Sequence, residues 1–260
     1  MPNKNREAAI VGVAESDLGA VPGKSATDLA VQGSLRALQD AGLRVADVDA
    51  VFTANLSRFS AIQLSEALGI FPAYVDSTLT GGSSFEMHLR HAAAAIKAGY
   101  CEVALIAYGS AQRSNRSRNI AGFLESGTSA AQYENVFAPL YPISFYAMVA
   151  QRYLHEYGAR SEDLAEVAVA ARSWAEHNPK AFARKPLTVD EVMAAPVVSS
   201  PLKVSDCCLV TDGGGAVIVT SRERARDLAK TPINVLGHGE TTTHDAMSQV
   251  PDLLRHGSAE

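Results

Sequence analysis

The stretch from Thr80 to Ser110, TGGSSFEMHLRHAAAAIKAGYCEVALIAYGS, indicates the fold class of this chain. Its glycine pair predicts a sharp turn at which the backbone can approach a ligand closely. One of the two serines that follow caps a helix expected at 83–98, and Glu86 stands at the spacing of a capping box with Ser83. The unbroken apolar run at 103–108, within a strand expected at 102–108, then predicts a strand that is covered on both faces.

The alternation of strands and helices continues on both sides of this stretch. Strands are expected at 8–13, 47–54, 73–79 and 233–239, and helices at 25–42, 60–69, 144–157, 161–177 and 221–228. Residues 205–220 read as a hairpin or as a turn followed by a strand, with the turn at Asp212-Gly213-Gly214-Gly215. Because strands alternate with helices of crossover length, a mainly parallel sheet is expected.

Residues 111–143 interrupt this alternation. The segment is rich in Ser, Asn, Gly and Arg, and its second half gathers Phe, Tyr and Pro. A loop of this length in a compact domain is usually functional or disordered. The aromatic residues and prolines favour an ordered flap over a free linker.

The overall composition narrows the classes of function. An apolar content of 47%, a charged content of 20% and a net charge of −5 fit a globular enzyme and argue against a nucleic-acid surface. Arg113, Arg116 and Arg118 form a local basic cluster, either a solvated loop or a contact to the phosphates of a nucleotide-bearing substrate. No apolar run has the length of a signal peptide or a membrane span, so a cytoplasmic location is expected.

The three cysteines predict neither a disulfide framework nor a zinc site. Cys101, Cys207 and Cys208 each stand at the start of an expected strand, which favours reduced, buried, structural side chains. His88 and His91 lie three residues apart on one helix face, without a further metal ligand at diagnostic spacing. Histidines packed at a helix interface or an active-site wall are therefore favoured, and no metal is expected.

The chain resembles the thiolase superfamily, and most closely the sterol-carrier-protein-type thiolases and thiolase-like acetyl-CoA acetyltransferases. Two motifs carry the resemblance: the turn, helix and strand at 80–110, and the strand motif CLVTDGGGAVIV at 208–219. In the family, the nucleophilic cysteine occupies the turn before the helix. Counting back from Ile96 and Gly99 places that cysteine at Gly82, so the family's nucleophile is absent here.

The resemblance implies an α/β, thiolase-like fold with helices covering the sheet and an inserted helical loop region. It divides the chain into a βαβ core at 1–110, the inserted region at 111–200, return strands at 201–240, and the start of a truncated C-terminal half at 241–260. A complete thiolase continues into a second, similar half with histidine and cysteine motifs for acid–base work. We therefore expect either that this chain is a fragment or that a partner supplies the remainder.

Candidate site residues follow from the residues and from the resemblance. Tyr141, Tyr146 and His238 are the candidates for catalysis, since a tyrosine hydroxyl can stabilise an enolate and His238 follows the last expected strand. The candidates for substrate binding are Gly81, Gly82, Ser83, Ser84, Tyr133, Phe137 and Arg113. Each also has a structural explanation: the serines as helix caps, the aromatic residues as loop packing and His238 as a turn residue. His244-Asp245-Ala246 looks only superficially like the family's later histidine motif, and that role is not transferred to it.

Three functions remain open. The working hypothesis is a thiolase-like enzyme of the acetyl-CoA acetyltransferase type, which makes or breaks carbon–carbon bonds in acyl-CoA thioesters. The first alternative is an aldol lyase on CoA-linked side chains that works with an OB-fold or zinc-ribbon partner and needs no covalent acyl intermediate. The second alternative is a non-catalytic scaffold subunit or a fragment. The resemblance implies a homodimer, a coenzyme A thioester as substrate and no permanently bound cofactor.

Overall fold

The structure, a computed structural model, describes residues 7–116, 127–228, 230–244 and 246–255. The chain divides into two compact units. The first, which we call the sheet unit, comprises the described residues up to 115 together with 211–240. The second, which we call the helical unit, comprises the described residues of 116–210 and 241–260. Each unit is described by itself.

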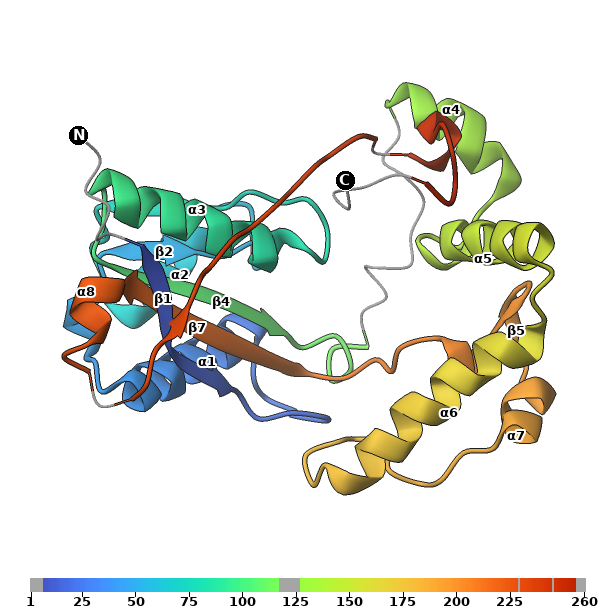
Figure 1. Cartoon of the computed structure of the whole chain (residues 1–260), viewed down its shortest axis with the longest axis horizontal. Helices are drawn as coiled ribbons and strands as arrows, with labels where there is room; N and C mark the ends of the chain where they lie inside the picture. The colour runs from blue at the N-terminus through green and yellow to red at the C-terminus, as the bar shows by residue number, and fades with distance from the viewer. Residues whose placement is uncertain (1–6, 117–126, 229, 245, 256–260) are drawn as a thin grey trace. The chain divides into compact units, whose positions relative to one another are not determined.

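A six-stranded sheet forms the centre of the sheet unit (Figure 1). Its strands, in spatial order, are β3 (Tyr74–Asp76), β2 (Ala50–Phe52), β4 (Val103–Ser110), β7 (Gly213–Ser221), β1 (Ala8–Glu15) and β8 (Ile233–Asn234). The pairs β3–β2 and β2–β4 are parallel, whereas β4–β7, β7–β1 and β1–β8 are antiparallel. The α/β expectation is confirmed, but the mainly parallel sheet is wrong. β7 lies between β4 and β1 and runs against both.

Helices cover both faces of this sheet. Helix α1 (Ala26–Ala41) and helix α2 (Ser60–Leu68) pack on one face, and α3 (Ser84–Ala98) packs on the other (Figure 1). Alternate residues of β4 therefore enter two separate cores: Val103 and Leu105 face α1, and Ala104 and Ile106 face α3. This two-sided burial explains why the strand reads as an unbroken apolar run.

Most elements of the sheet unit lie where the sequence predicts them, but several are shorter. Ser25 caps α1 through a capping box, and Gly42 ends it in the left-handed conformation. The strand expected at 47–54 is the 3-10 helix η1 (Val45–Asp47) followed by β2, and the helix expected at 221–228 is the single turn α8 (Arg222–Ala225). The strands expected at 73–79 and 233–239 are reduced to β3 and β8.

The glycine run 213–215 is wrongly predicted as a turn. These three residues begin β7 and pair with β4, and Gly215 also pairs with β1. Their small size serves the packing of α1, because a Cβ added at Gly33 of α1 would lie 3.1 Å from the backbone of Gly215. A Cβ at Gly109 of β4 would lie 2.0 Å from the carbonyl oxygen of Ala26. The glycines therefore mark a close helix–sheet approach rather than a reversal of the chain.

The helical unit is built mainly from α5 (Ile143–Tyr157) and α6 (Ser161–His177), which confirms the two helices expected there. The smaller elements are α4 (Ser129–Glu134), η2 (Asn135–Phe137), α7 (Val189–Ala194), β5 (Val197–Ser199), β6 (Leu202–Lys203), η3 (Val204–Asp206) and η4 (Met247–Gln249). The hairpin of this region is β5–β6, which lies before the 205–220 hairpin considered from the sequence. Of the flap expected at 111–143, residues 117–126 lie outside the described part, and α4 with η2 occupies 129–137.

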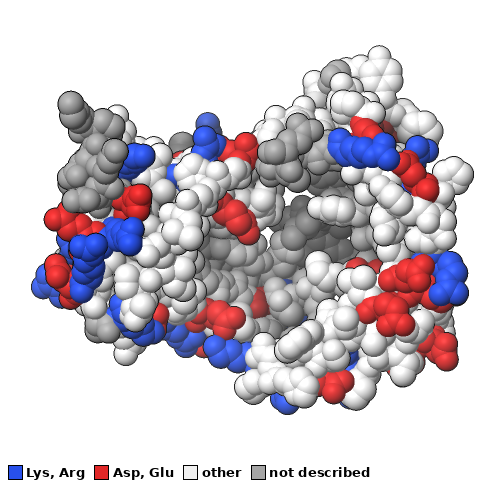
Figure 2. All heavy atoms as spheres, viewed as in Figure 1, with Lys and Arg blue, Asp and Glu red and all other residues white. Residues whose placement is uncertain are grey.

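Charged side chains are interspersed on the face seen in Figure 2, where lysines and arginines lie beside acidic residues. In the part of the chain that the structure describes, no helix is long and apolar enough to cross a membrane.

Candidate active-site residues

The glycine turn is held by the first residue of α3. Ser84 is fully buried; its Oγ donates to the Gly81 carbonyl at 2.7 Å and accepts from the Thr80 N–H at 2.8 Å. The Ser84 N–H donates to the same Gly81 carbonyl at 3.2 Å. Ser83 is the exposed N-cap residue and makes no side-chain capping bond, so the capping box expected with Glu86 is wrong. The buried Ser84 therefore stabilises the turn through hydrogen bonds to Thr80 and Gly81.

Gly82 lies exposed on this turn. A Cβ built at this position meets no heavy atom within 4 Å, and its φ lies outside the left-handed region. A larger side chain, including that of cysteine, therefore fits here without a clash. The absence of the family's nucleophile is a matter of sequence and not of space.

Within the sheet unit, Cys101 does not replace that nucleophile at the turn. Cys101 is buried beyond the C-terminal end of α3, whereas the glycine turn precedes the N-terminal end of this helix. The 15 residues of α3 separate the two by about 22 Å along the helix axis, at about 1.5 Å per residue. Cys207 is part-buried, and burial raises the pKa of its thiol, as do Asp206 and Cys208 beside it. Cys208 is exposed. Both lie in the loop before β7, so the expectation of buried cysteines at strand starts is correct only for Cys101.

A series of polar contacts between β3, the residues that precede the turn, and α3 supports the turn. Asp76, at the end of β3, accepts bonds from the N–H of Thr78 at 2.8 Å and from its hydroxyl at 2.7 Å. Asp76 also contacts His91 Nδ1 at 2.6 Å. His88 is fully buried, and its Nε2 lies 3.0 Å from the Thr78 carbonyl oxygen. The two histidines therefore fix the entry into the turn.

Charge and burial act in opposite directions on these groups. Burial raises the pKa of Asp76, but the bonds from Thr78 and His91 outweigh it and hold the pKa below its usual range. Burial lowers the pKa of His88, against the attraction of Asp76. Arg90 pairs with Glu240, whose Oε1 lies 3.7 Å from His91 Nε2, so the His91 ring lies between the carboxylates of Asp76 and Glu240. Sequence reasoning missed this network; the signal for it is an acidic residue at a strand end opposite two histidines on the following helix.

The expected absence of a metal stays a prediction. Among the residues that the structure describes, no group of three or more His, Cys, Asp or Glu side chains could hold a metal ion. The histidine pair shares no ligand position, because His88 turns to a backbone carbonyl and His91 to Asp76.

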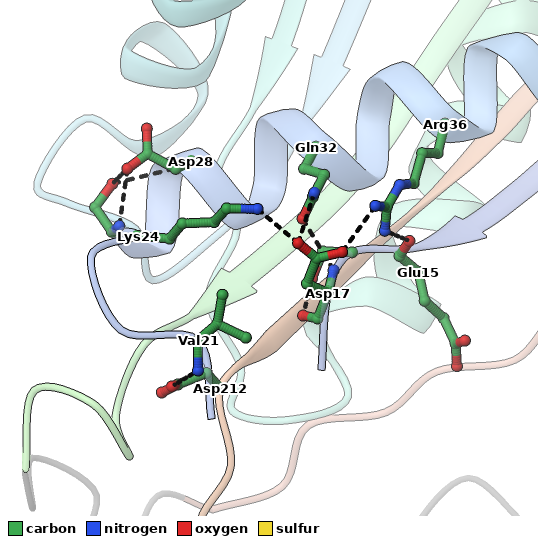
Figure 3. A network of polar contacts seen from close by, with 10 residues as sticks. Glu15, Asp17, Val21, Lys24, Asp28, Gln32, Arg36 and Asp212 are labelled. Carbon is green, nitrogen blue, oxygen red and sulfur yellow. Dashed lines mark hydrogen bonds and ion pairs between the residues drawn. The ribbon is translucent and has the colours of Figure 1, made fainter. Parts of the chain in front are cut away.

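A second polar network fixes the loop between β1 and α1 (Figure 3). Asp17 accepts bonds from Lys24, Gln32 and Arg36 at 2.7 to 2.9 Å, which hold its pKa far below the usual range. These partners satisfy the carboxylate, and we assign the network to the fold.

Asp212 joins that loop to the residues after β4. The buried carboxylate accepts from the N–H of Val21 at 2.8 Å and of Ser114 at 3.0 Å, and it also bonds the Ser114 hydroxyl. Burial raises the pKa of Asp212, but these hydrogen bonds and the one from the N–H of Arg113 lower it by more. The pKa therefore lies below its usual value. The acidic residue of the CLVTDGGGAVIV motif is therefore a structural clasp. The side chain of Arg113 is exposed, as is that of Arg116, and Arg118 lies outside the described residues.

An aromatic cavity of about 350 Å³ lies within the helical unit. It is lined by Tyr141, Pro142, Phe145, Tyr146, Val149, His244, Met247 and Leu253. Tyr141 packs edge-on against Phe145 with the ring centroids 5.4 Å apart. The structure thus brings together the two tyrosines singled out from the sequence. It adds His244, to which the sequence alone assigns no role.

The remaining candidates lie elsewhere. Tyr133 and Phe137, on α4 and η2, are 69% and 83% exposed and do not line the aromatic cavity. His238 is exposed in the segment after β8. A larger cavity of about 620 Å³ beside α5 is lined by charged residues, but Glu156 there pairs with both Arg152 and Arg255. We assign no ligand to it.

Known proteins with similar sequences include a CoA lyase, an aldolase and an acetyl-CoA acetyltransferase. The chain is 34% identical over 251 residues to 17-hydroxy-3-oxo-4-pregnene-20-carboxyl-CoA lyase of Mycobacterium tuberculosis, covering 94% of this chain and 65% of the lyase. It is 35% identical over 245 residues to the steroid side-chain-cleaving aldolase of Thermomonospora curvata, covering 92% and 63%. An acetyl-CoA acetyltransferase of Methanothermobacter thermautotrophicus is 28% identical over 257 residues, covering 96% and 66%. The chain thus spans less than two thirds of the length of both lyase-type relatives.

Solved structures give the same picture. The Ltp2-ChsH2(DUF35) aldolase matches with a TM-score of 0.81 and 34% identity, over 93% of this chain and 63% of the solved one. A monomeric SCP2-thiolase-like protein from Mycobacterium smegmatis matches in fold, with a TM-score of 0.66 and 21% identity over 88% and 49%. No family model matches the chain. The fold, a sheet with helices on both faces and a glycine turn before α3, is that of a thiolase-like protein. The resemblance to the thiolase superfamily expected from the sequence is thus confirmed.

Proposed function

We propose that this chain belongs to a carbon–carbon lyase that cleaves CoA thioesters of 3-hydroxy acids by a retro-aldol reaction. The observation that carries the proposal is Gly82, which stands where the resemblance places the acyl-accepting cysteine. A retro-aldol cleavage needs a base and an enolate stabiliser but no covalent acyl intermediate. The two relatives of 34% and 35% identity are named as a CoA lyase and an aldolase, which supports this reaction over acyl transfer.

The described residues offer groups for both tasks. Tyr141 and Tyr146 line a cavity with largely apolar walls, where a phenol can donate a hydrogen bond to a developing oxyanion. The coenzyme A thioester is the proposed substrate, and a permanently bound cofactor is not part of the proposal. The exposed guanidinium of Arg113 is a candidate for contact with the phosphates of coenzyme A.

Acyl transfer is the second candidate. It is favoured by the 28% identical acetyl-CoA acetyltransferase and requires a nucleophile that the turn at Gly82 does not supply. The non-catalytic scaffold is the reading that remains if neither reaction is found.

We also propose two kinds of partner. The matched solved aldolase is a complex of Ltp2 with ChsH2(DUF35), which supports a second subunit such as the OB-fold or zinc-ribbon protein expected from the sequence. A homodimer is supported by β3, which lies at one edge of the sheet with Val75 exposed. An unpaired edge strand is a template for pairing with a second copy. A cytoplasmic location stays a prediction of the sequence.

The test is a product analysis. The protein, purified from its own cells with any subunit that accompanies it, is incubated with the CoA thioester of a tertiary 3-hydroxy acid. We expect equimolar amounts of a ketone and of the shortened acyl-CoA, and no cleavage of the matched thioester that lacks the hydroxyl group. Transfer of the acyl group to free coenzyme A or to acetyl-CoA would instead establish the second candidate.

A further inference from the structure

His244 brings an imidazole into the aromatic cavity of the helical unit. The other lining residues are the two tyrosines and the apolar side chains of Pro142, Phe145, Val149, Met247 and Leu253. Among these eight residues, His244 alone carries an imidazole, the side chain that most often serves as a general acid or base. The cavity thus combines apolar walls, two phenol hydroxyls and one imidazole.

The imidazole has a local contact, and the segment that follows it is anchored to two helices. The ring contacts Thr243, with 2.6 Å between Nδ1 and the Thr243 hydroxyl oxygen. Downstream, the N–H of Ser248 donates to Glu134 Oε1 at 2.6 Å, and Arg255 pairs with Glu156 of α5 at 2.6 Å. These contacts fasten the segment after residue 245 to α4 and α5, the helices beside the cavity. Anchoring of this segment favours the position of His244 beside the two tyrosines, which proton transfer in this cavity requires.

We propose that this cavity binds the apolar group that carries the 3-hydroxyl of the substrate, and that His244 is the acid–base residue of the cleavage. The inference rests on the proposed function and deepens it. The substrate class is a CoA thioester of a 3-hydroxy acid whose hydroxyl carbon belongs to a bulky apolar group. The volume of about 350 Å³ lies within the range of pockets that enclose small molecules.

The proton and electron balance of the step closes without a further reactant. In the tautomer that carries its proton on Nδ1, beside the Thr243 hydroxyl, the Nε2 atom of His244 takes the proton of the substrate hydroxyl. The bond between the hydroxyl carbon and the carbon next to the thioester breaks, and its electron pair becomes the enolate of the shorter acyl-CoA. The hydroxyl carbon becomes a ketone. The imidazolium then returns the proton to the enolate carbon, and the oxidation state of the protein is unchanged.

The experiment compares two histidine variants in the same helical unit. His244→Gln removes the imidazole from the cavity, and His177→Gln does so at an exposed position at the end of α6. We expect kcat to fall at least about 100-fold in the first variant, with KM changed by less than about threefold, because general acid–base catalysis contributes about 10²–10⁴. The second variant should match the wild type. In His244→Gly, added imidazole should restore part of the lost rate, which a loss of structure would not allow.

The outcomes separate this inference from the proposed function. If the wild type cleaves the thioester and His244→Gln keeps more than about a third of the rate, His244 is not the acid–base residue and the lyase function stands. If the wild type does not cleave, the lyase function and the catalytic role fall together. Labelling of wild-type histidines with diethyl pyrocarbonate then tests the cavity. Protection of His244 but not His177 by the 3-hydroxyacyl-CoA supports the binding site, and equal labelling overturns it.

Discussion

Gly81 and Gly82 are adjacent but occupy different backbone conformations. Gly81 has a φ of +87°, where side chains are strained, whereas Gly82 lies outside that region with open space around it. We expect Gly81→Ala to lower the free energy of unfolding by about 1 kcal/mol or more. Gly82→Ala should leave it unchanged or raise it by up to about 1 kcal/mol. Urea denaturation of the two variants checks this, and equal losses would mean that the turn has a different conformation.

Asp212 shows a stronger effect of a single side chain. Its buried carboxylate accepts hydrogen bonds from two loops, and the amide of Asp212→Asn would place a donor against these donors. We expect a loss of about 1.5–3 kcal/mol in the free energy of unfolding, measured in urea. The matched control is Asp227→Asn, at an exposed position, which should change stability by less than about 0.5 kcal/mol.

The same carboxylate has a defined pH dependence. Its folded-state pKa lies below the unfolded value, so its stabilising contribution is fully present above about pH 4 and is lost as pH falls through the folded pKa. The difference in stability between wild type and Asp212→Asn should therefore shrink over the acid range below about pH 4. A difference that stays constant over this range would show that the clasp does not depend on ionised Asp212.

At the scale of elements, the packing of α1 on the sheet depends on glycines in the strands. A Cβ at Gly109 would lie 2.0 Å from Ala26 O and 2.7 Å from Ala30 N, both backbone atoms of the α1 region. Gly109→Ala should lower the free energy of unfolding by about 3 kcal/mol or prevent folding. Gly237→Ala, where an added Cβ meets nothing within 4 Å, is the control and should unfold like wild type. A stable Gly109→Ala protein would contradict the close approach.

This packing also explains which elements the sequence could predict. Helices such as α1 and α6 carry local signals in their periodicity and in the residues at their ends, and they lie at the expected positions. The glycine run that begins β7 has the amino-acid composition of a turn. Only its tertiary contact with Gly33 of α1 distinguishes this strand from a turn. The direction of β7 in the sheet is likewise a long-range property, which local spacing does not encode.

The candidate site was predictable only in part for the same reason. The glycine turn and the tyrosines at 141 and 146 follow from motif and composition. The contact of Asp76 with His91 joins residues 15 positions apart, and the place of His244 beside the tyrosines depends on the return of the chain after residue 240. Neither arrangement leaves a local pattern in the sequence.

For the whole molecule, the central claim is that carbon–carbon cleavage proceeds without an acyl-enzyme. Gly82 removes the thiol from the turn, Cys101 lies at the other end of α3, and the lyase-type relatives match over more than nine tenths of this chain. If the claim holds, the substrate stays bound only by non-covalent contacts. Thiolase-type transfer would instead pass through a covalent intermediate.

The most direct measurement is the intact mass of the protein, quenched with acid while it turns over a 3-hydroxyacyl-CoA, with the products quantified in the same sample. We predict an unchanged protein mass together with the formation of ketone and shortened acyl-CoA. A mass increase equal to the acyl group, formed at a rate that matches turnover, would contradict the account. It would show that a nucleophile elsewhere in the protein accepts the acyl group.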